Sequence, residues 1–131
     1  MKSVVIDTNA LLRLILNDIP QQKKMTEELL KKAMSNEIKV CVAQTVIFEI
    51  DFILKKYYEF KKETVIEYLK SLVTTPYLEV ESSEIFRMTL SFYEKEEISF
   101  VDCFLLSKAK IEKADLFTFD KKLKNLIKTS S

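Results

Sequence analysis

The sequence predicts an α/β domain, a three-layer α/β/α sandwich in which helices cover both faces of a mainly parallel central sheet. Two observations support this class. Short apolar runs rich in β-branched residues alternate along the chain with longer segments of helical periodicity. Two of these short runs end at an aspartate, Asp7 or Asp120, as buried parallel strands do at their carboxyl ends. A length of 131 residues suits a single domain spanning residues 1–131.

The first half of the chain contains two of the expected strands. Residues 3–6 are apolar and β-branched and stop at Asp7, which predicts the first strand. The second is expected at residues 39–42. Helices are expected at residues 11–16, from the turn around Pro20 to about Ser35, from an N-cap at Thr45 to near Tyr57, and at 61–74.

In the second half, Pro76 breaks the preceding helix and introduces a third expected strand at residues 77–80. Helices follow at residues 83–95 and 100–111. Residues 116–119 predict a last short strand that ends at Asp120, and residues 121–127 a terminal helix. There is no repeat, linker or low-complexity segment.

The composition excludes most enzyme chemistries, because the chain contains no histidine and no glycine. Histidine-based triads, histidine-ligated metals, Walker loops and GxGxxG turns are all ruled out. Carboxylates, hydroxyls and lysines remain, and they suit a hard cation such as Mg²⁺ or Mn²⁺.

Charge and hydropathy predict a cytoplasmic protein without a membrane span. The net charge is only +1, so any nucleic-acid binding must be local. No apolar run approaches the roughly 18 residues of a membrane helix, and the start of the chain does not resemble a secretion signal. Cys41 and Cys103 form no CxxC pair and are expected to be small core residues.

Three aspartates and one glutamate stand out, although each has a structural alternative. Asp7 and Asp120 could cap the helices that follow them, and Asp102 completes a capping box with Ser99. Glu49 could be an ordinary solvent-facing helix residue.

Glu49 and Asp51 are the only charged residues between Thr45 and Lys55, in the most apolar helix. Two positions on a helix are about 200° apart, so these acids cannot share a face, and one is expected to point inward. A buried carboxylate needs a partner or a cation.

Taken together, the four acids lie in a pattern that resembles the PIN domain family over nearly the whole chain. The similarity rests on four blocks in the family's order and spacing: residues 4–12 (VVIDTNALL), 46–50 (VIFEI), 99–102 (SFVD) and 118–123 (TFDKKL). One departure is Lys113-Ala114, where the family usually has a glycine before the last strand, so other residues must form this turn.

The resemblance implies a PIN-like fold and cleavage of single-stranded RNA with bound Mg²⁺ or Mn²⁺. Four positions match the family's catalytic and metal-binding acids: Asp7, Glu49, Asp102 and Asp120. Three positions match polar residues that orient ligands or substrate: Thr8, Asn9 and Thr118. Clustered carboxylates repel one another, so cations would stabilise such a site.

Family members of this size are commonly VapC toxins, so the resemblance also implies a homodimer and a cognate VapB-like antitoxin. Lys121 and Lys122, directly after Asp120, are candidate RNA-binding residues, as are Lys55 and Lys56, which alternate with aromatics. A solvated helix face is the more common explanation of such lysines. The apolar helix at residues 11–16 could join a dimer interface or accept a partner peptide.

Three other functions remain open. A haloacid dehalogenase-type phosphatase also has an aspartate after its first strand, but it requires Asp-x-Asp, and position 9 is Asn. A receiver domain needs paired acids before its phosphorylated aspartate. A PIN-like scaffold could bind RNA or protein without cutting.

Overall fold

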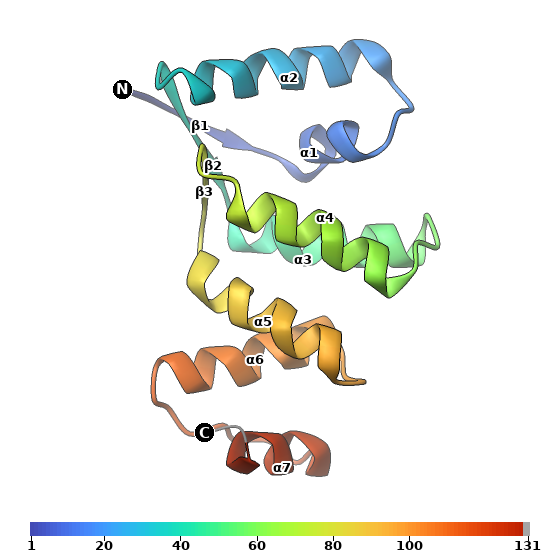
Figure 1. The fold of residues 1–131 in the computed structure, drawn as a ribbon, viewed down its shortest axis with the longest axis vertical. Coiled ribbons are helices and arrows are strands. Elements are labelled where there is room, and N and C mark those ends of the chain that lie inside the picture. Colours follow the sequence, from blue (N-terminus) through green and yellow to red (C-terminus); the bar gives the residue numbers. More distant parts are fainter. Residues whose placement is uncertain (130–131) are drawn as a thin grey trace. The chain divides into compact units, whose positions relative to one another are not determined.

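The computed structural model describes residues 1–129, which form three strands and seven helices. The chain divides into two compact units, Met1–Ser83 and Glu84–Ser131. All three strands belong to the first unit (Figure 1). None of the helices described combines the length and apolar character that a membrane span requires.

The first unit is built on a parallel sheet in the order β1-β2-β3. Its strands are β1 (Lys2–Ile6), β2 (Ile38–Val42) and β3 (Leu78–Val80). Four helices accompany them: α1 (Thr8–Ile15), α2 (Pro20–Met34), α3 (Gln44–Lys56) and α4 (Lys62–Thr74). The helical connections return each strand parallel to its neighbour, so the carboxyl ends of the strands lie at one edge of the sheet.

Alternate residues of the strands form the core of this unit. Val40 pairs in register with Val4 and Leu78, and it is completely buried. Residues one position along point to the opposite face, where Val5 is 76% exposed and Cys41 is half-buried. The expectation that both cysteines are core residues therefore holds for Cys103 but not for Cys41.

Over residues 84–129 the second unit consists of helices joined by loops. It contains most of α5 (Ser83–Lys95), then α6 (Phe100–Ile111) and α7 (Lys121–Thr129). Phe86 stacks on Phe100 at 6.0 Å between ring centroids and contacts Phe104 at 5.1 Å. These aromatic rings fix α5 against α6, because offset stacking adds to the burial of apolar area.

The predicted parallel sheet and alternating helices are confirmed, and most element boundaries agree to within a few residues. The strand predicted at residues 116–119 is wrong, because this segment pairs with no strand in the described structure. Phe117 and Phe119 are 86% and 85% exposed, and their rings contact each other at 5.5 Å. A short apolar run predicts a strand, but a strand also requires a hydrogen-bonded neighbour.

The predicted N-cap at Thr45 is also wrong. The cap position is occupied two residues earlier by Ala43, which makes no side-chain hydrogen bond, and helix α3 begins at Gln44. The backbone N–H of Gln44 is instead bound by a carboxylate from another part of the first unit, as described below.

Candidate functional site

Asp7 lies at the carboxyl end of β1, directly after the buried Ile6. It is the N-cap of α1, where its Oδ1 accepts a 2.9 Å hydrogen bond from the backbone N–H of Ala10. The capping role is therefore confirmed. This hydrogen bond uses only Oδ1 of Asp7. The side chain is exposed, so Oδ2 is left for another ligand.

Thr8 connects this strand end to Glu49. The Thr8 side chain is buried, and its hydroxyl donates a 2.7 Å hydrogen bond to Oε1 of Glu49. Glu49 is exposed and comes from the second turn of α3. The structure therefore brings Glu49 beside the residue that follows Asp7, within one unit. Asn9 is exposed at the start of α1.

Asp51, and not Glu49, is the acid of α3 that points inward. Asp51 is only 6% exposed, and its carboxylate pairs with Lys55 at 3.3 Å, one helical turn further on. This pairing answers the need of a buried carboxylate for a partner. It also means that Lys55, a candidate RNA-binding residue, already has an ionic partner.

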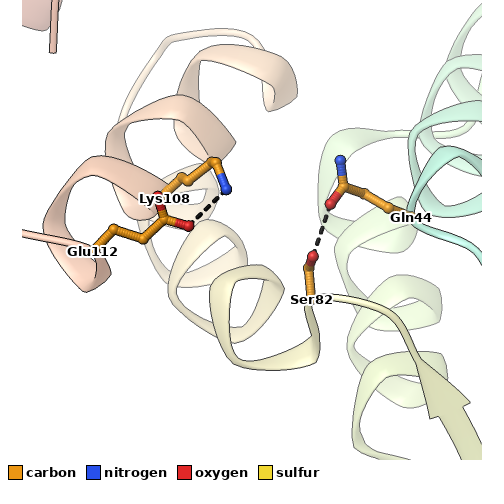
Figure 2. A network of polar contacts seen from close by, with 4 residues as sticks. All are labelled: Gln44, Ser82, Lys108 and Glu112. Atoms are coloured by element: carbon orange, nitrogen blue, oxygen red, sulfur yellow. Dashed lines mark hydrogen bonds and ion pairs between the residues drawn. The ribbon is translucent and has the colours of Figure 1, made fainter. Parts of the chain in front are cut away.

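A polar network at the ends of β2 and β3 is a feature that sequence reasoning missed. Oε1 of Glu81 accepts a 2.8 Å hydrogen bond from the backbone N–H of Gln44, and Ser82 donates a 2.7 Å hydrogen bond to Oε1 of Gln44 (Figure 2). Glu81 thus caps α3 in place of the missing N-cap side chain. The signal that could have found it is an acid directly after a predicted strand.

Asp102 lies in the first turn of α6, in the second unit. Ser99 is the N-cap, and its hydroxyl oxygen accepts a 3.0 Å hydrogen bond from the backbone N–H of Asp102. The capping interaction expected for Ser99 is confirmed. The half-buried Asp102 carboxylate itself has no hydrogen-bond or ionic partner among residues 1–129.

Asp120 precedes α7, and its Oδ1 accepts a 3.0 Å hydrogen bond from the backbone N–H of Leu123. This confirms the capping alternative for Asp120. The Thr118 hydroxyl oxygen accepts a 3.1 Å hydrogen bond from the backbone N–H of Asp120. Thr118 therefore orients the backbone of Asp120, and with it the position from which the carboxylate projects.

The turn that lacks the family's usual glycine is formed by Lys113, which adopts a left-handed backbone with φ of 53°. The next residue closes the end of α6, since the N–H of Ala114 donates to the carbonyl of Ala109 at 2.8 Å. A glycine would adopt this conformation without a Cβ clash.

The lysines after Asp120 are accessible. Lys121 and Lys122 are both exposed in the first turn of α7, and Lys122 Nζ donates to the carbonyl of Glu97 at 3.4 Å. Not every lysine is available for phosphate: Lys108 pairs with Glu112 at 2.7 Å on α6 (Figure 2). Among the candidate lysines, Lys56 is exposed at the end of α3.

Each unit thus holds two of the four predicted acids: Asp7 and Glu49 in the first, Asp102 and Asp120 in the second. Within the range 1–129, no three Cys, Asp or Glu side chains are grouped closely enough to hold a metal ion. Convergence of all four acids stays a prediction. Their chemistry fits a divalent ion, since each keeps at least one carboxylate oxygen without a partner in the described range.

Comparison with known proteins gives two findings. The PIN domain family matches residues 4–128, a range that includes all four acids and both units. The chain is also 24% identical to a VapC ribonuclease of Aquifex aeolicus (strain VF5) over 106 residues, which cover 81% of this chain and 78% of that protein. The extent of the family match and the parallel α/β architecture agree, and the chain belongs to the PIN domain family.

Proposed function

We propose that this protein is a metal-dependent endoribonuclease that cleaves single-stranded RNA, and that it is the VapC-like toxin of a toxin-antitoxin pair. The observation that supports this most strongly is the PIN family match across the four acids, each with a carboxylate oxygen left free. The similarity to a VapC ribonuclease points to RNA as the substrate.

In this proposal Asp7 and Asp102 bind Mg²⁺ or Mn²⁺ directly, and Glu49 and Asp120 bind it directly or through water. When bound, such an ion lowers the pKa of a water and stabilises charge on the phosphodiester. The chain's own contribution is orientation: Thr8 restrains Glu49, and Thr118 holds the backbone of Asp120. Asn9, which is exposed two residues after Asp7, is proposed to orient a metal ligand or the substrate.

The proposed partners follow from the same similarity. A VapB-like antitoxin would cover the acidic site and keep the nuclease inactive in the cytoplasm, and the active form would be a homodimer. Light scattering after gel filtration tests the dimer, and a monomeric mass at micromolar concentration would exclude it.

The alternative is a PIN scaffold that binds RNA or protein without cutting. The presence of all four acids at the family's acidic positions favours the enzyme. The phosphatase alternative has no support from the family match.

The decisive experiment is RNA cleavage by the purified protein after EDTA treatment, with Mn²⁺ or Mg²⁺ then restored. Cleavage should return with the ion and fall at least tenfold in the Asp7→Asn and Asp102→Asn variants. Asp115→Asn is the matched control, because Asp115 is exposed and lies outside the proposed site. No cleavage of varied RNAs with either ion, or full activity of Asp7→Asn, would favour the scaffold.

A further inference from the structure

Helix α3 has a single exposed stripe that leads away from Glu49. Its exposed residues are Thr45, Glu49, Phe52 and Lys56. Steps of four, three and four residues keep these positions on one face of a helix. The rise of 1.5 Å per residue places Lys56 about 10 Å beyond Glu49 along the helix axis.

The stripe ends at an aromatic turn between α3 and α4, which consists of Tyr57, Tyr58 and Phe60 together with the adjoining Phe52 and Tyr68. Phe52 and Tyr57 contact each other edge to face at 6.1 Å between ring centroids, and they are 55% and 71% exposed. This exposed ring area is more than a turn needs for its own stability.

The aromatic turn is held rigidly. The backbone N–H groups of Tyr57 and Tyr58 donate to the carbonyl of Ile53 at 3.0 and 3.3 Å, and that of Phe60 donates to the carbonyl of Leu54 at 3.0 Å. Below them, Phe60 contacts Tyr58 at 6.4 Å and Tyr68 at 6.1 Å. The exposed rings therefore sit on a fixed base, which reduces the entropy lost when a ligand binds.

Lysines precede and follow these rings in the chain, and Glu59 lies between them. Residues 55–62 contain four lysines and one glutamate, Glu59. Lys56 and Lys61 are exposed and have no ionic partner within residues 1–129, whereas Lys55 pairs with Asp51. Lysine is depleted in protein-protein interfaces, but lysine combined with accessible aromatic rings is typical of surfaces that bind single-stranded nucleic acid.

We propose that the exposed stripe of α3 and the aromatic turn form an accessory binding surface for single-stranded RNA, separate from the carboxylates. Bases stack on Tyr57 and Phe52, and Lys56 and Lys61 contact the phosphates. The strand then follows the stripe toward Glu49. This inference rests on the proposed nuclease function, whose substrate it would hold beyond the point of cleavage.

The test is fluorescence anisotropy with labelled 12-nucleotide oligo-U and oligo-A RNA. It uses the full chain as the Asp7→Asn variant in EDTA, so that binding is measured without cleavage. Replacing Tyr57 with alanine should weaken binding about fivefold or more, while Tyr57→Phe should bind as the parent does. Tyr57→Leu, which keeps apolar area but no ring, should be as weak as Tyr57→Ala. Because Tyr57 is 71% exposed, thermal unfolding of all three variants should match the parent.

The proposed contact between Lys56 and a phosphate is tested by the salt dependence of RNA binding. Lys56→Gln should reduce the slope of log affinity against log salt by about 0.7, the value for one phosphate contact on a single strand. Lys24→Gln is the matched control, since Lys24 is an exposed lysine of α2. Its slope should equal that of the parent.

Three results would overturn the inference: no RNA binding by the parent at micromolar protein, unchanged binding by Tyr57→Ala, or parent-like binding by Tyr57→Leu. A changed molecular mass of Tyr57→Ala with unchanged RNA affinity would assign the surface to a second protein copy instead. If ring-dependent binding is found but the wild-type protein cleaves no RNA with Mn²⁺, the nuclease proposal alone fails.

Discussion

The hydroxyl of Thr8 donates a 2.7 Å hydrogen bond to Oε1 of Glu49, which joins the first residue of α1 to the second turn of α3. Thr8 is buried whereas Glu49 is exposed, so a fixed donor restrains a side chain that would otherwise sample many rotamers. The contact leaves Oε2 of Glu49 free. It is the clearest link between the fold of the first unit and the proposed chemistry.

Replacing Thr8 with valine should therefore impair metal use more than folding. Valine matches threonine in shape but removes the donor, at a cost of about 1 kcal/mol in the free energy of unfolding. The Mn²⁺ concentration that gives half-maximal RNA cleavage should rise about tenfold, as for other residues that orient ligands. Thr8→Ser should retain most of the wild-type response. Equal metal dependence of Thr8→Val and wild type would show that the hydrogen bond is only structural.

Two substitutions can separate the capping role of Asp7 from its proposed role in metal binding. Asparagine caps a helix about as well as aspartate, so Asp7→Asn should keep the stability of the wild type while losing the charge proposed to bind metal. Alanine removes both, so Asp7→Ala should also lose about 1 kcal/mol of unfolding free energy. Urea denaturation combined with an RNA cleavage assay measures both effects. If Asp7→Asn is as active as the wild type, Asp7 is a cap and nothing more.

The sequence predicted the parallel sheet well because its signals are local. The run before Asp7 and the helical spacing of α3 each follow from side-chain periodicity within a few residues. Capping by Asp7, Ser99 and Asp120 could also be predicted from the sequence, because each cap binds a backbone N–H only three residues away.

Features that depend on distant partners could not be predicted. The cap of α3 comes from Glu81, which is 37 residues from Gln44. Likewise, periodicity could not decide which of Glu49 and Asp51 is buried, since that depends on the elements packed around α3. The segment 116–119 has the apolar character of a buried strand, but its sequence does not provide a neighbouring strand.

The left-handed turn at Lys113 offers a stabilising substitution. A non-glycine residue at φ of 53° is strained by its Cβ, and glycine removes that strain at the end of a helix. Lys113→Gly should raise the free energy of unfolding by about 0.5 to 1 kcal/mol, and Lys113→Ala should not. Lys110→Gly is the matched control, because Lys110 lies within α6. This variant should lose about 1 kcal/mol of unfolding free energy. A loss of stability in Lys113→Gly would show that the lysine side chain makes a compensating contribution.

Ser82 is expected to stabilise the fold through its side chain and to destabilise it through its backbone conformation. This residue donates to Gln44 Oε1 at 2.7 Å but adopts φ of 62°. Ser82→Ala loses the hydrogen bond and keeps the strain, so it should cost about 1 kcal/mol. Ser82→Gly loses the bond but relieves the strain and should be close to neutral. Guanidinium denaturation compares them, and equal destabilisation by both would mean that the positive φ carries no cost.

Divalent ions should stabilise the folded protein if the four acids act together. Bringing carboxylates close is unfavourable through repulsion, and a bound cation removes that cost. Mn²⁺ at about 100 times its dissociation constant would contribute about 2.7 kcal/mol, which corresponds to a rise in Tm of about 5 °C or more for a chain of this size. The Asp102 carboxylate has no partner in the described range, and Asp102→Asn removes one of the repelling charges, so this variant should not lower the Tm in EDTA but should abolish most of the Mn²⁺ shift. Asp115→Asn, which removes an equal charge elsewhere, should keep the shift, and NaCl at matched ionic strength should not produce one. A shift of equal size in Asp102→Asn would place the ion away from Asp102 and contradict its proposed role as a metal ligand.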